Sequence, residues 1–381
     1  MSRLLFSFMG GHGHFVPLVP IARAAQTAGH TVAFACGPAL VGAVEAAGFS
    51  AYPLGAATGG APERSPLRQL DPAREDDEFR ERFAGAAPRG KVPLLLAFCA
   101  EWRPDVILCD EADFGSLLAA ERLDLPRVTV NVMAAGSFVR ADLLSDTLNA
   151  VRVALGLEPD PTLAMLQRDL VLSPFPPAFR DPRYPLPPTA FSYNPQASAR
   201  ATAPPVWAGM RPKAPLVYFS LGTVFNLESG DLFDRALAGL QALPVNLIVT
   251  VGHEIDPLEF GRQPEHVRIE RYVPQNDLLP HCSLIVTHGG SGSVAGALTH
   301  GVPLLILPMG ADQPHNAWRC EALGLGRWLD PVAATPADVL SAAAELIADP
   351  AYRSALAVLR DDFAALPGPD AALERVEALL R

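Results

Sequence analysis

The sequence has few cysteines and no long apolar run. Its cysteines are scattered and form no C-x-x-C pair, so we expect neither a disulfide framework nor a zinc site, and a reducing cytoplasm is the default compartment. No stretch approaches the ~20 apolar residues of a membrane span. The short apolar run after Arg3 ends in a Gly/His segment instead of a signal-peptide cleavage site. We therefore predict a cytoplasmic protein without an integral membrane segment.

Positive charge is also scarce. Lysine and arginine together number 30 against 41 aspartates and glutamates, and only Lys91 and Lys213 are lysines. A net charge of −11 gives no general attraction to nucleic acid or anionic membranes. With 49% hydrophobic and 19% charged residues, extended disorder is not expected. At about 150 residues per domain, 381 residues predict two domains.

Short apolar strands alternate with helices in two long stretches of the chain. The first begins with a strand from 4 to 9, a Gly/His loop, a helix from 16 to 28 and a strand from 31 to 36. The alternation stops at Pro174–Pro215, which holds 12 of the 38 prolines, and then restarts. This pattern predicts two Rossmann-like α/β domains that face each other across a cleft, with ligands at the carboxyl ends of parallel strands.

The charged run Arg74–Arg82 stands in a less regular stretch, 55–92. A solvated surface helix is the first interpretation and a mobile substrate lid is the second.

The first chemistry-bearing motif is GGHGHFVP, Gly10–Pro17. It lacks the third glycine of a dinucleotide fingerprint, and Cys36 and Gly37 stand where an acidic residue would close the second strand, so nicotinamide binding is poorly supported. His12 and His14 remain as candidates for a base that removes a proton from a hydroxyl near neutral pH. The alternative is that both cap the helix or pack.

The second motif is PDVILCDEADF, Pro104–Phe114. Asp110 and Glu111 end a buried strand and are expected to face the same cleft as His14. A carboxylate there would fix the tautomer of an imidazole and stabilise its cation. The alternative role is a helix N-cap, for which Asp113 is the better candidate.

The third motif spans Arg271–Ala317 and is the most specific. A strand at 284–287 leads into HGGSGS, His288–Ser293, and then into a helix. Glycines let the backbone approach a ligand, and a helix N-terminus presents N–H groups to an anion. The motif predicts a diphosphate site in which His288 and Ser293 add donors and Asp312-Gln313 binds sugar hydroxyls.

These motifs resemble family 1 nucleotide-sugar glycosyltransferases, which are inverting enzymes of the GT-B fold. The resemblance covers both halves of the chain and the order of the motifs, and it is closest to the bacterial branch that decorates secondary metabolites. The matching segments are Gly13-His14-Phe15-Val16-Pro17 (G-H-x-x-P), Ser220-Leu221-Gly222-Thr223 (S-x-G-S/T), Tyr272-Val273-Pro274-Gln275 (W-x-P-Q), His288-Gly289-Gly290 (H-C/G-G) and Asp312-Gln313 (D/E-Q).

The resemblance implies an acceptor-binding domain at 1–200, a donor-binding domain at 201–365 and a C-terminal helix, 366–381, that crosses back to the first domain. It implies His14 as catalytic base and Asp110 as its acidic partner. The donor-binding residues that it implies, together with the helix-terminus argument, are Ser220, Gly222, Thr223, Tyr272, Val273, Gln275, His288, Gly290, Ser291, Gly292, Ser293, Asp312 and Gln313. Guesses for the acceptor pocket are His12, Phe79, Phe83, Met133 and Phe138, for most of which core packing is the alternative.

The expected partners are a nucleoside-diphosphate sugar and a hydrophobic small-molecule acceptor, with no nucleic acid and a monomeric or homodimeric state. We expect no cofactor and, because no D-x-D occurs, no bound metal. Gly296 stands where plant-type relatives have a glutamate for the ribose hydroxyls. Its absence, with Tyr272 to stack on the base, predicts a thymidine-diphosphate donor and leaves room beside the sugar. The alternatives are a sugar-nucleotide 2-epimerase of GT-B fold and a non-catalytic auxiliary protein.

Overall fold

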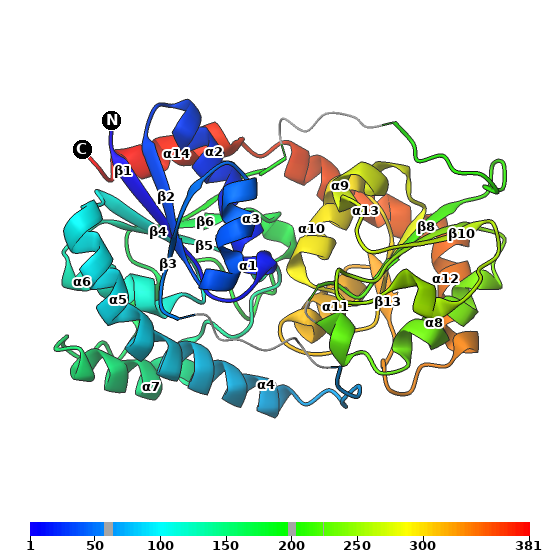
Figure 1. The fold of residues 1–381 in the computed structure, drawn as a ribbon, viewed down its shortest axis with the longest axis horizontal. Coiled ribbons are helices and arrows are strands. Elements are labelled where there is room, and N and C mark those ends of the chain that lie inside the picture. Colours follow the sequence, from blue (N-terminus) through cyan, green and yellow to red (C-terminus); the bar gives the residue numbers. More distant parts are fainter. Residues whose placement is uncertain (57–63, 197–202, 224) are drawn as a thin grey trace. The chain divides into compact units, whose positions relative to one another are not determined.

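The computed structural model describes residues 1–56, 64–196, 203–223 and 225–381 (Figure 1). The chain divides into two compact units: unit 1 is Met1–Gly59, Pro72–Ser198 and Ala365–Arg381, and unit 2 is Gly60–Asp71 and Ala199–Ala364. The boundary expected between residues 200 and 201 lies outside the described residues. Within the described ranges, no helix is both long and apolar enough to cross a membrane.

Unit 1 is built on a parallel sheet of seven strands in the order β3-β2-β1-β4-β5-β6-β7. The order reverses between β1 and β4, and this is the point at which ligands bind in open α/β sheets. Among the described residues of the proline-rich stretch, only β7 joins the sheet, and it lies at the edge, where the missing N–H donors of proline are tolerated. The strands are β1 (Arg3–Ser7), β2 (Thr31–Cys36), β3 (Ser50–Pro53), β4 (Val106–Asp110), β5 (Arg127–Val130), β6 (Leu170–Ser173) and β7 (Ala190–Ser192).

The helices of unit 1 cover its sheet and bury an apolar cluster on each face. The expected glycine loop is helical at its end, because α1 (His12–Phe15) runs on through η1 (Val16–Leu18) into α2 (Val19–Thr27). The predicted start at Val16 was therefore four residues late. The remaining helical elements are η2 (Pro38–Leu40), α3 (Val41–Ala46), α4 (Pro72–Glu78), η3 (Phe79–Ala86), α5 (Ala87–Trp102), α6 (Phe114–Arg122), α7 (Ala141–Ala154), η4 (Ala164–Leu166), η5 (Pro177–Phe179) and α14 (Pro369–Ala378).

The C-terminal helix α14 belongs to unit 1. Its buried Leu373 and Val376 lie in the same apolar cluster as Ile21 of α2, and α14 runs beside α2 in Figure 1. The His30 Nε2 atom lies 2.9 Å from an oxygen of Glu377. The C-terminus is thus fixed to the face of the sheet that carries α2.

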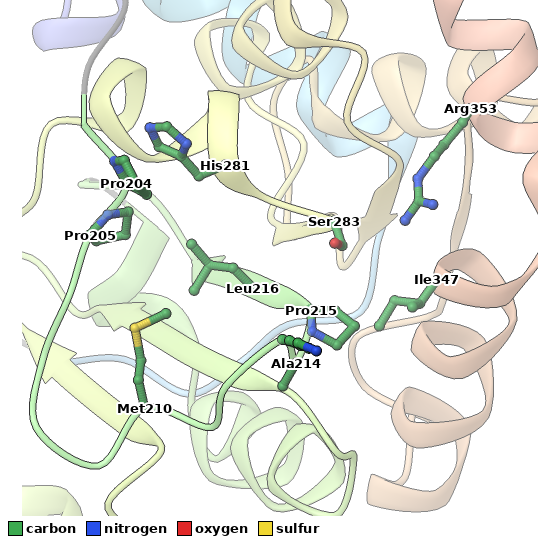
Figure 2. A pocket seen from close by; sticks show the side chains of 11 residues that line it. Pro204, Pro205, Met210, Ala214, Pro215, Leu216, His281, Ser283, Ile347 and Arg353 are labelled. Atoms are coloured by element: carbon green, nitrogen blue, oxygen red, sulfur yellow. The ribbon is translucent and has the colours of Figure 1, made fainter.

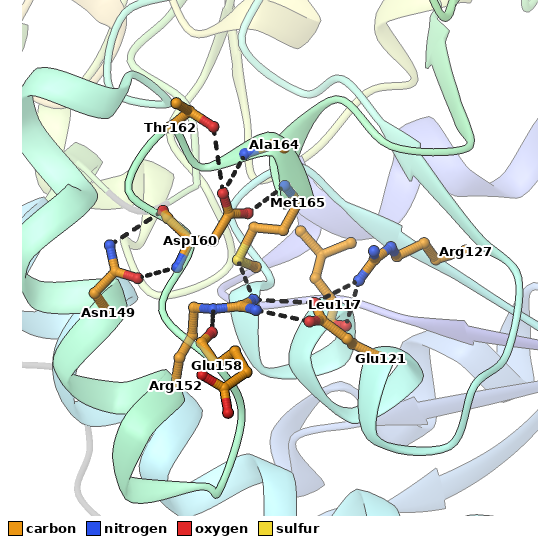
Figure 3. Close-up of polar contacts among 10 residues, drawn as sticks. All are labelled: Leu117, Glu121, Arg127, Asn149, Arg152, Glu158, Asp160, Thr162, Ala164 and Met165. Carbon is orange, nitrogen blue, oxygen red and sulfur yellow. Dashed lines mark hydrogen bonds and ion pairs between the residues drawn. The ribbon is translucent and has the colours of Figure 1, made fainter.

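An ion-pair network joins α6, β5 and α7 on the other face (Figure 3). Glu121 accepts hydrogen bonds from Arg152 and Arg127, whose side chains are each only 4% exposed. These bonds, chiefly those from Arg152, lower the pKa of Glu121 to about 2. Arg152 also donates to the carbonyl of Glu158, so the segment after α7 is held to the same network.

Unit 2 repeats the pattern with six parallel strands in the order β10-β9-β8-β11-β12-β13, which reverses between β8 and β11. The strands are β8 (Leu216–Ser220), β9 (Asn246–Thr250), β10 (Val267–Glu270), β11 (Leu284–Thr287), β12 (Leu304–Ile306) and β13 (Gly326–Trp328). The helical elements are η6 (Phe225–Glu228), α8 (Leu232–Gln241), η7 (Pro257–Phe260), α9 (Gln275–Leu278), η8 (Leu279–His281), α10 (Ser291–His300), α11 (Gln313–Ala322), α12 (Pro336–Ala348) and α13 (Pro350–Ala364).

One segment from the first half of the chain is part of unit 2. The Ser65 N–H donates to the Leu227 carbonyl of η6 at 2.9 Å, and Gln69 donates to Asp330 at 3.0 Å. Leu67 packs against the core of unit 2. No local pattern indicates this placement, because the contacts join residues far apart in the chain.

Candidate functional site

The reversal point of the unit 1 sheet holds a histidine and a buried carboxylate. His14 lies on α1, just after β1, and its Nδ1 is 3.1 Å from Oδ1 of Asp110 at the end of β4. Asp110 is fully buried and also accepts the backbone N–H groups of Met9 and Ala112, at 2.6 and 2.7 Å. The carboxylate favours the tautomer that carries the proton on Nδ1, so a proton-accepting role falls to Nε2. The predicted contact between His14 and Asp110 is present.

Gly10, the first glycine of the histidine motif, lies against the ring of His14. Its φ is +92°, and a Cβ built on it would lie 2.9 Å from Cδ2 of His14. A larger residue would be strained and would push the imidazole aside. His12 is exposed and has no part in the pair, so only one of the two candidate histidines meets the acid.

Glu111 does not face His14, and that expectation was wrong. Its carboxylate accepts the N–H groups of Val132 and Met133 at 2.6 and 2.7 Å and the side-chain amide of Asn131 at 2.8 Å. β4 ends at Asp110, and the Glu111 carboxylate after it bonds the segment that follows β5, so the two carboxylates have different partners. Burial raises the pKa of Glu111, although Arg180 opposes that effect. Glu111 thus holds the segment after β5.

Asp113 is the N-cap of α6, as predicted, and accepts the Ser116 N–H at 3.1 Å. Sequence reasoning missed its second partner, Lys91 of α5. The buried Lys91 ammonium lies 2.5 Å from Asp113 and 3.1 Å from the carbonyl of Phe8. One ion pair therefore fixes both α6 and the end of β1, which carries the His14 loop.

The residues guessed for an acceptor pocket divide into two groups. Phe79, Met133 and Phe138 are buried in the unit 1 core, which agrees with the packing alternative. Phe83 is half-buried, and its ring stacks on the imidazole of His14. The charged run Arg74–Arg82, which ends just before Phe83, is helical, but it is not only a solvated face, because Asp76 pairs with Arg140 and Phe79 is buried.

The corresponding point of unit 2 also holds a histidine. β8 and β11 are neighbours with Ser220 opposite Thr287, so their following loops lie together. Atoms of the His288 ring would lie 2.6 Å from a Cβ at Gly222, which has φ +80°, and 2.5 Å from one at Gly290. Burial lowers the pKa of His288 to about 4. His288 is thus a neutral hydrogen-bonding group near pH 7.

The helix that follows, α10, begins at the N-cap Gly290 and has no acidic residue in its first turn. Gly292 is exposed there. The Ser293 N–H already donates to the Gly290 carbonyl at 2.9 Å. The N–H groups before it precede the first helical carbonyl, and such groups favour an anion. Ser291 donates to Asp312 at 2.6 Å, and Ser293 donates to Gln275 at 3.2 Å. The structure therefore gathers the ends of α9, α10 and α11 around one helix N-terminus.

The space expected beside Gly296 is not empty. A Cβ at Gly296 would lie 2.5 Å from Nε2 of Gln275 and 2.7 Å from Cδ1 of Leu279. The expectation of room at this position was wrong, because those two side chains fill it. No pattern in the sequence could reveal this contact, since it depends on how α9 packs on α10.

Other predicted donor residues differ in exposure. Gln313 is 2% exposed, and its side-chain oxygen accepts the Met309 N–H at 2.8 Å. Tyr272 is 60% exposed, with its ring 5.8 Å from that of His253. Thr223 is exposed, and Val273 is half-buried. Tyr272 thus has the exposed aromatic ring that the predicted stacking on a nucleobase requires.

A cavity of about 450 Å³ lies at the opposite edge of the unit 2 sheet (Figure 2). Leu216 and Ser283, at the amino ends of β8 and β11, line it. The side chains of His281 and Arg353 stand on opposite sides of it and do not converge. It is therefore separate from the glycine loops. Among the residues that the structure describes, no group of three or more His, Cys, Asp and Glu could hold a metal ion.

Known proteins resemble the whole chain. The family model described as "Erythromycin biosynthesis protein CIII-like, C-terminal domain" matches residues 234–379. L-demethylnoviosyl transferase of Streptomyces niveus is 31% identical over 384 residues, which cover 99% of this chain and 98% of that protein. 4'-demethylrebeccamycin synthase of Lentzea aerocolonigenes is 28% identical over 427 residues, and the match covers 100% of this chain and 100% of that protein.

Solved structures share the fold. Spinosyn rhamnosyltransferase SpnG matches with a TM-score of 0.82 and 25% identity over 99% of this chain and 100% of that one. SpnG has also been solved in complex with thymidine diphosphate and in complex with the spinosyn aglycone. Three findings agree on the family of this chain. They are the two parallel-sheet α/β units, the full-length relative at 31% identity and the structural match to SpnG. The chain belongs to the GT-B glycosyltransferases of bacterial antibiotic biosynthesis.

Proposed function

We propose that this glycosyltransferase moves a sugar, with inversion, from a thymidine-diphosphate donor to a hydrophobic natural-product acceptor. The observation that carries the proposal is the pairing of His14 with a fully buried Asp110, because it supplies a base suited to activating a hydroxyl. The transferase names of the relatives and the two SpnG complexes support the substrate classes.

In the proposed reaction, His14 Nε2 takes the proton of the acceptor hydroxyl while Asp110 holds Nδ1–H. The acceptor oxygen then forms a bond to the anomeric carbon as the bond from that carbon to the diphosphate oxygen breaks. The electron pair of the broken bond leaves with the nucleoside diphosphate, and the proton stays on His14. The step balances with the two substrates alone, so we propose no cofactor. The pairing with Asp110 favours the resulting imidazolium.

We propose that the diphosphate lies on the first turn of α10. The N–H groups at the start of that turn and the neutral His288 would donate to phosphate oxygens. The turn itself has no acidic residue, and the neighbouring Asp312 carboxylate accepts hydrogen bonds from Ser291 and Asn316. Gly222 and Gly290 permit the close approach of their loops to the ring of His288, and would do the same for a ligand. The exposed ring of Tyr272 would stack on the base.

The preference for thymidine over uridine no longer rests on empty space at Gly296, because Gln275 fills it. It rests instead on the side chain of Gln275, which is a neutral amide and not a carboxylate. A carboxylate would be left unpaired by a 2′-deoxyribose, whereas a neutral amide that already accepts a bond from Ser293 loses little. The thymine methyl would add apolar contact on Tyr272.

Calorimetric titration of the full chain with thymidine diphosphate and with uridine diphosphate tests the donor. We expect tighter binding of thymidine diphosphate, and weaker binding of both to Tyr272→Ala. The exposed Tyr52→Ala in unit 1 is the matched control and should bind as the wild type does. Equal affinities, or uridine diphosphate ahead, would overturn the donor assignment. Turnover of a thymidine-diphosphate sugar with a panel of polyketide and polyphenol acceptors then tests the transfer itself.

A further inference from the structure

A row of nearly parallel rings leads from the core of unit 1 to His14. The Phe138 and Phe79 rings are 4.8 Å apart at 17°, Phe79 and Phe83 are 4.9 Å apart at 15°, and Phe83 and His14 are 6.1 Å apart at 16°. Phe114 packs edge-on against Phe79 at 6.1 Å. Phe138 and Phe79 are buried, Phe83 is half-buried, and the His14 side chain is 25% exposed. The histidine is therefore the outer end of a column anchored in the core.

The segment that presents Phe83 has an unusual backbone. η3 (Phe79–Ala86) is a π-helix between the α-helices α4 and α5. Such segments are rare and occur often at functional sites, because the wider turn re-aims the side chains that follow. The buried Ala84 holds η3 to the core, and the Asp76–Arg140 ion pair fixes the turn before it.

The hydrogen bond to Asp110 alone does not fix the plane of the imidazole. A hydrogen bond tolerates a range of angles, so small joint changes in the side-chain torsions χ1 and χ2 can keep that bond and still swing Nε2 away from an acceptor. Gly10 closes one edge of the ring, where a Cβ would lie 3.1 Å from Nε2. The Phe83 ring lies nearly parallel to the imidazole, with the two centroids 6.1 Å apart. Gly10 and Phe83 together narrow the range of orientations open to the imidazole.

We propose that Phe83 is a positioning residue for His14, held by the π-helical turn of η3 so that its ring fixes the plane of the imidazole. The proposal rests on the proposed role of His14 as base. Small displacements of a catalytic group are costly, so loss of the ring should lower the rate of the chemical step and leave donor binding alone.

Phe83→Leu tests this, because it keeps apolar bulk and removes the ring. We expect kcat to fall by roughly 10–10²-fold with the KM for the nucleotide sugar unchanged. In the NMR spectrum of the full chain, the ring protons of His14, assigned by comparison with His14→Ala, should lose the upfield ring-current shift that a stacked phenyl ring causes. Phe83→Tyr should restore both readouts. Should the leucine variant not fold, Phe83→Met is the second ring-free variant.

Phe98→Leu is the matched control, because Phe98 is a half-buried ring in the adjoining α5 that stacks on Trp102 and not on His14. It should leave kcat and the His14 resonances unchanged. An unshifted His14 resonance in Phe83→Leu, with only the acceptor KM raised, would overturn the proposal and make Phe83 a wall of the acceptor site. If His14→Ala retains full turnover, the proposed base fails, but the NMR result still reports whether Phe83 orients the ring.

Discussion

The two units share one strand order up to the last strand of unit 1, and each places a histidine where that order reverses, yet the two histidines have opposite surroundings. The Nδ1 of His14 meets the fully buried carboxylate of Asp110. The Nδ1 of His288 lies 3.3 Å from the hydroxyl of Thr287, and burial lowers its pKa to about 4. An acid beside a histidine favours its cation, whereas burial without an acid keeps it neutral. The same fold position thus suits the proposed proton acceptor in unit 1 and the proposed neutral donor in unit 2.

The helices that begin beside the two histidines also differ in how their N-termini are capped. In unit 1 the helix after β4 is capped by Asp113, which pairs with the buried Lys91. In unit 2 the helix after β11 begins at Gly290, which has no side chain to cap it. An uncapped N-terminus keeps its N–H groups for a ligand, while a capped one uses them in the structure. This difference supports the proposal that unit 2 binds the anion and that unit 1 holds the base in place.

Breaking the buried ion pair of unit 1 should have the largest effect on stability. Lys91→Met leaves the Asp113 carboxylate buried without its cation, so the free energy of unfolding should fall by about 3–5 kcal/mol. Lys213→Met, at the other lysine of the chain, is the exposed control and should change it little. Thermal and denaturant unfolding measure both. Equal stability of the two variants would mean that the ion pair is not a support of this site.

Removing the acid of the pair should lower turnover more than stability. Asp110→Asn keeps the shape but no longer stabilises the imidazolium, so kcat should fall, by less than the ~10²–10⁴-fold expected when the base is removed. This loss should be smaller than that of His14→Ala, because the base itself remains. Asp105→Asn, a carboxylate near the start of β4 that accepts the Arg3 N–H, is the control. A wild-type rate for Asp110→Asn would remove the acid from the mechanism.

The neutral state of His288 should make the stability of the protein depend on pH. Its folded pKa of about 4 lies below the usual 6.5, so the unfolded chain binds more protons between these values. The contribution of neutral His288 to the free energy of unfolding is complete above pH 6.5 and is lost as the pH falls toward 4. The loss at pH 5 is at most about 2 kcal/mol. Denaturant unfolding from pH 7 to 5 should show a shallower loss in His288→Gln than in the exposed-site control His12→Gln. Parallel curves would contradict the neutral assignment.

Substitution of the glycine beside each histidine should have the smallest effects, but each substitution should change only one property, either turnover or nucleotide affinity. Gly10→Ala should lower kcat about tenfold with no change in thymidine diphosphate affinity, because its Cβ would displace His14. Gly222→Ala should weaken that affinity about tenfold, because its Cβ would lie 2.6 Å from the ring of His288. Gly42→Ala has open space at its Cβ and should behave as the wild type. An affinity change in Gly10→Ala would contradict the division between the units.

Local patterns in the sequence predicted much of this molecule. Apolar runs located β2 and β11 at the bounds observed, and the cap at Asp113 followed from its place before α6. The contact between His14 and Asp110 was predictable because the carboxyl ends of neighbouring parallel strands meet at one edge of the sheet.

What could not be predicted depends on contacts between distant residues. Lys91 reaches Asp113 from another helix, and Gln275 fills the space at Gly296 from a neighbouring one. Glu111 turns away from Asp110 because the strand ends there and its partners come from the segment after β5. Nothing in the run around Phe83 marks a π-helix, because its hydrophobic spacing also fits an α-helix.

The most direct test of the account measures two quantities on two variants, the turnover rate and the dissociation constant for thymidine diphosphate. His14→Ala should lower turnover by ~10²–10⁴-fold and leave that dissociation constant unchanged, since it removes only the base. His288→Ala should weaken thymidine diphosphate binding, since it removes a donor at the first turn of α10. Loss of nucleotide binding in His14→Ala, or unaltered binding in His288→Ala, would contradict the assignment of the base to unit 1 and the donor to unit 2.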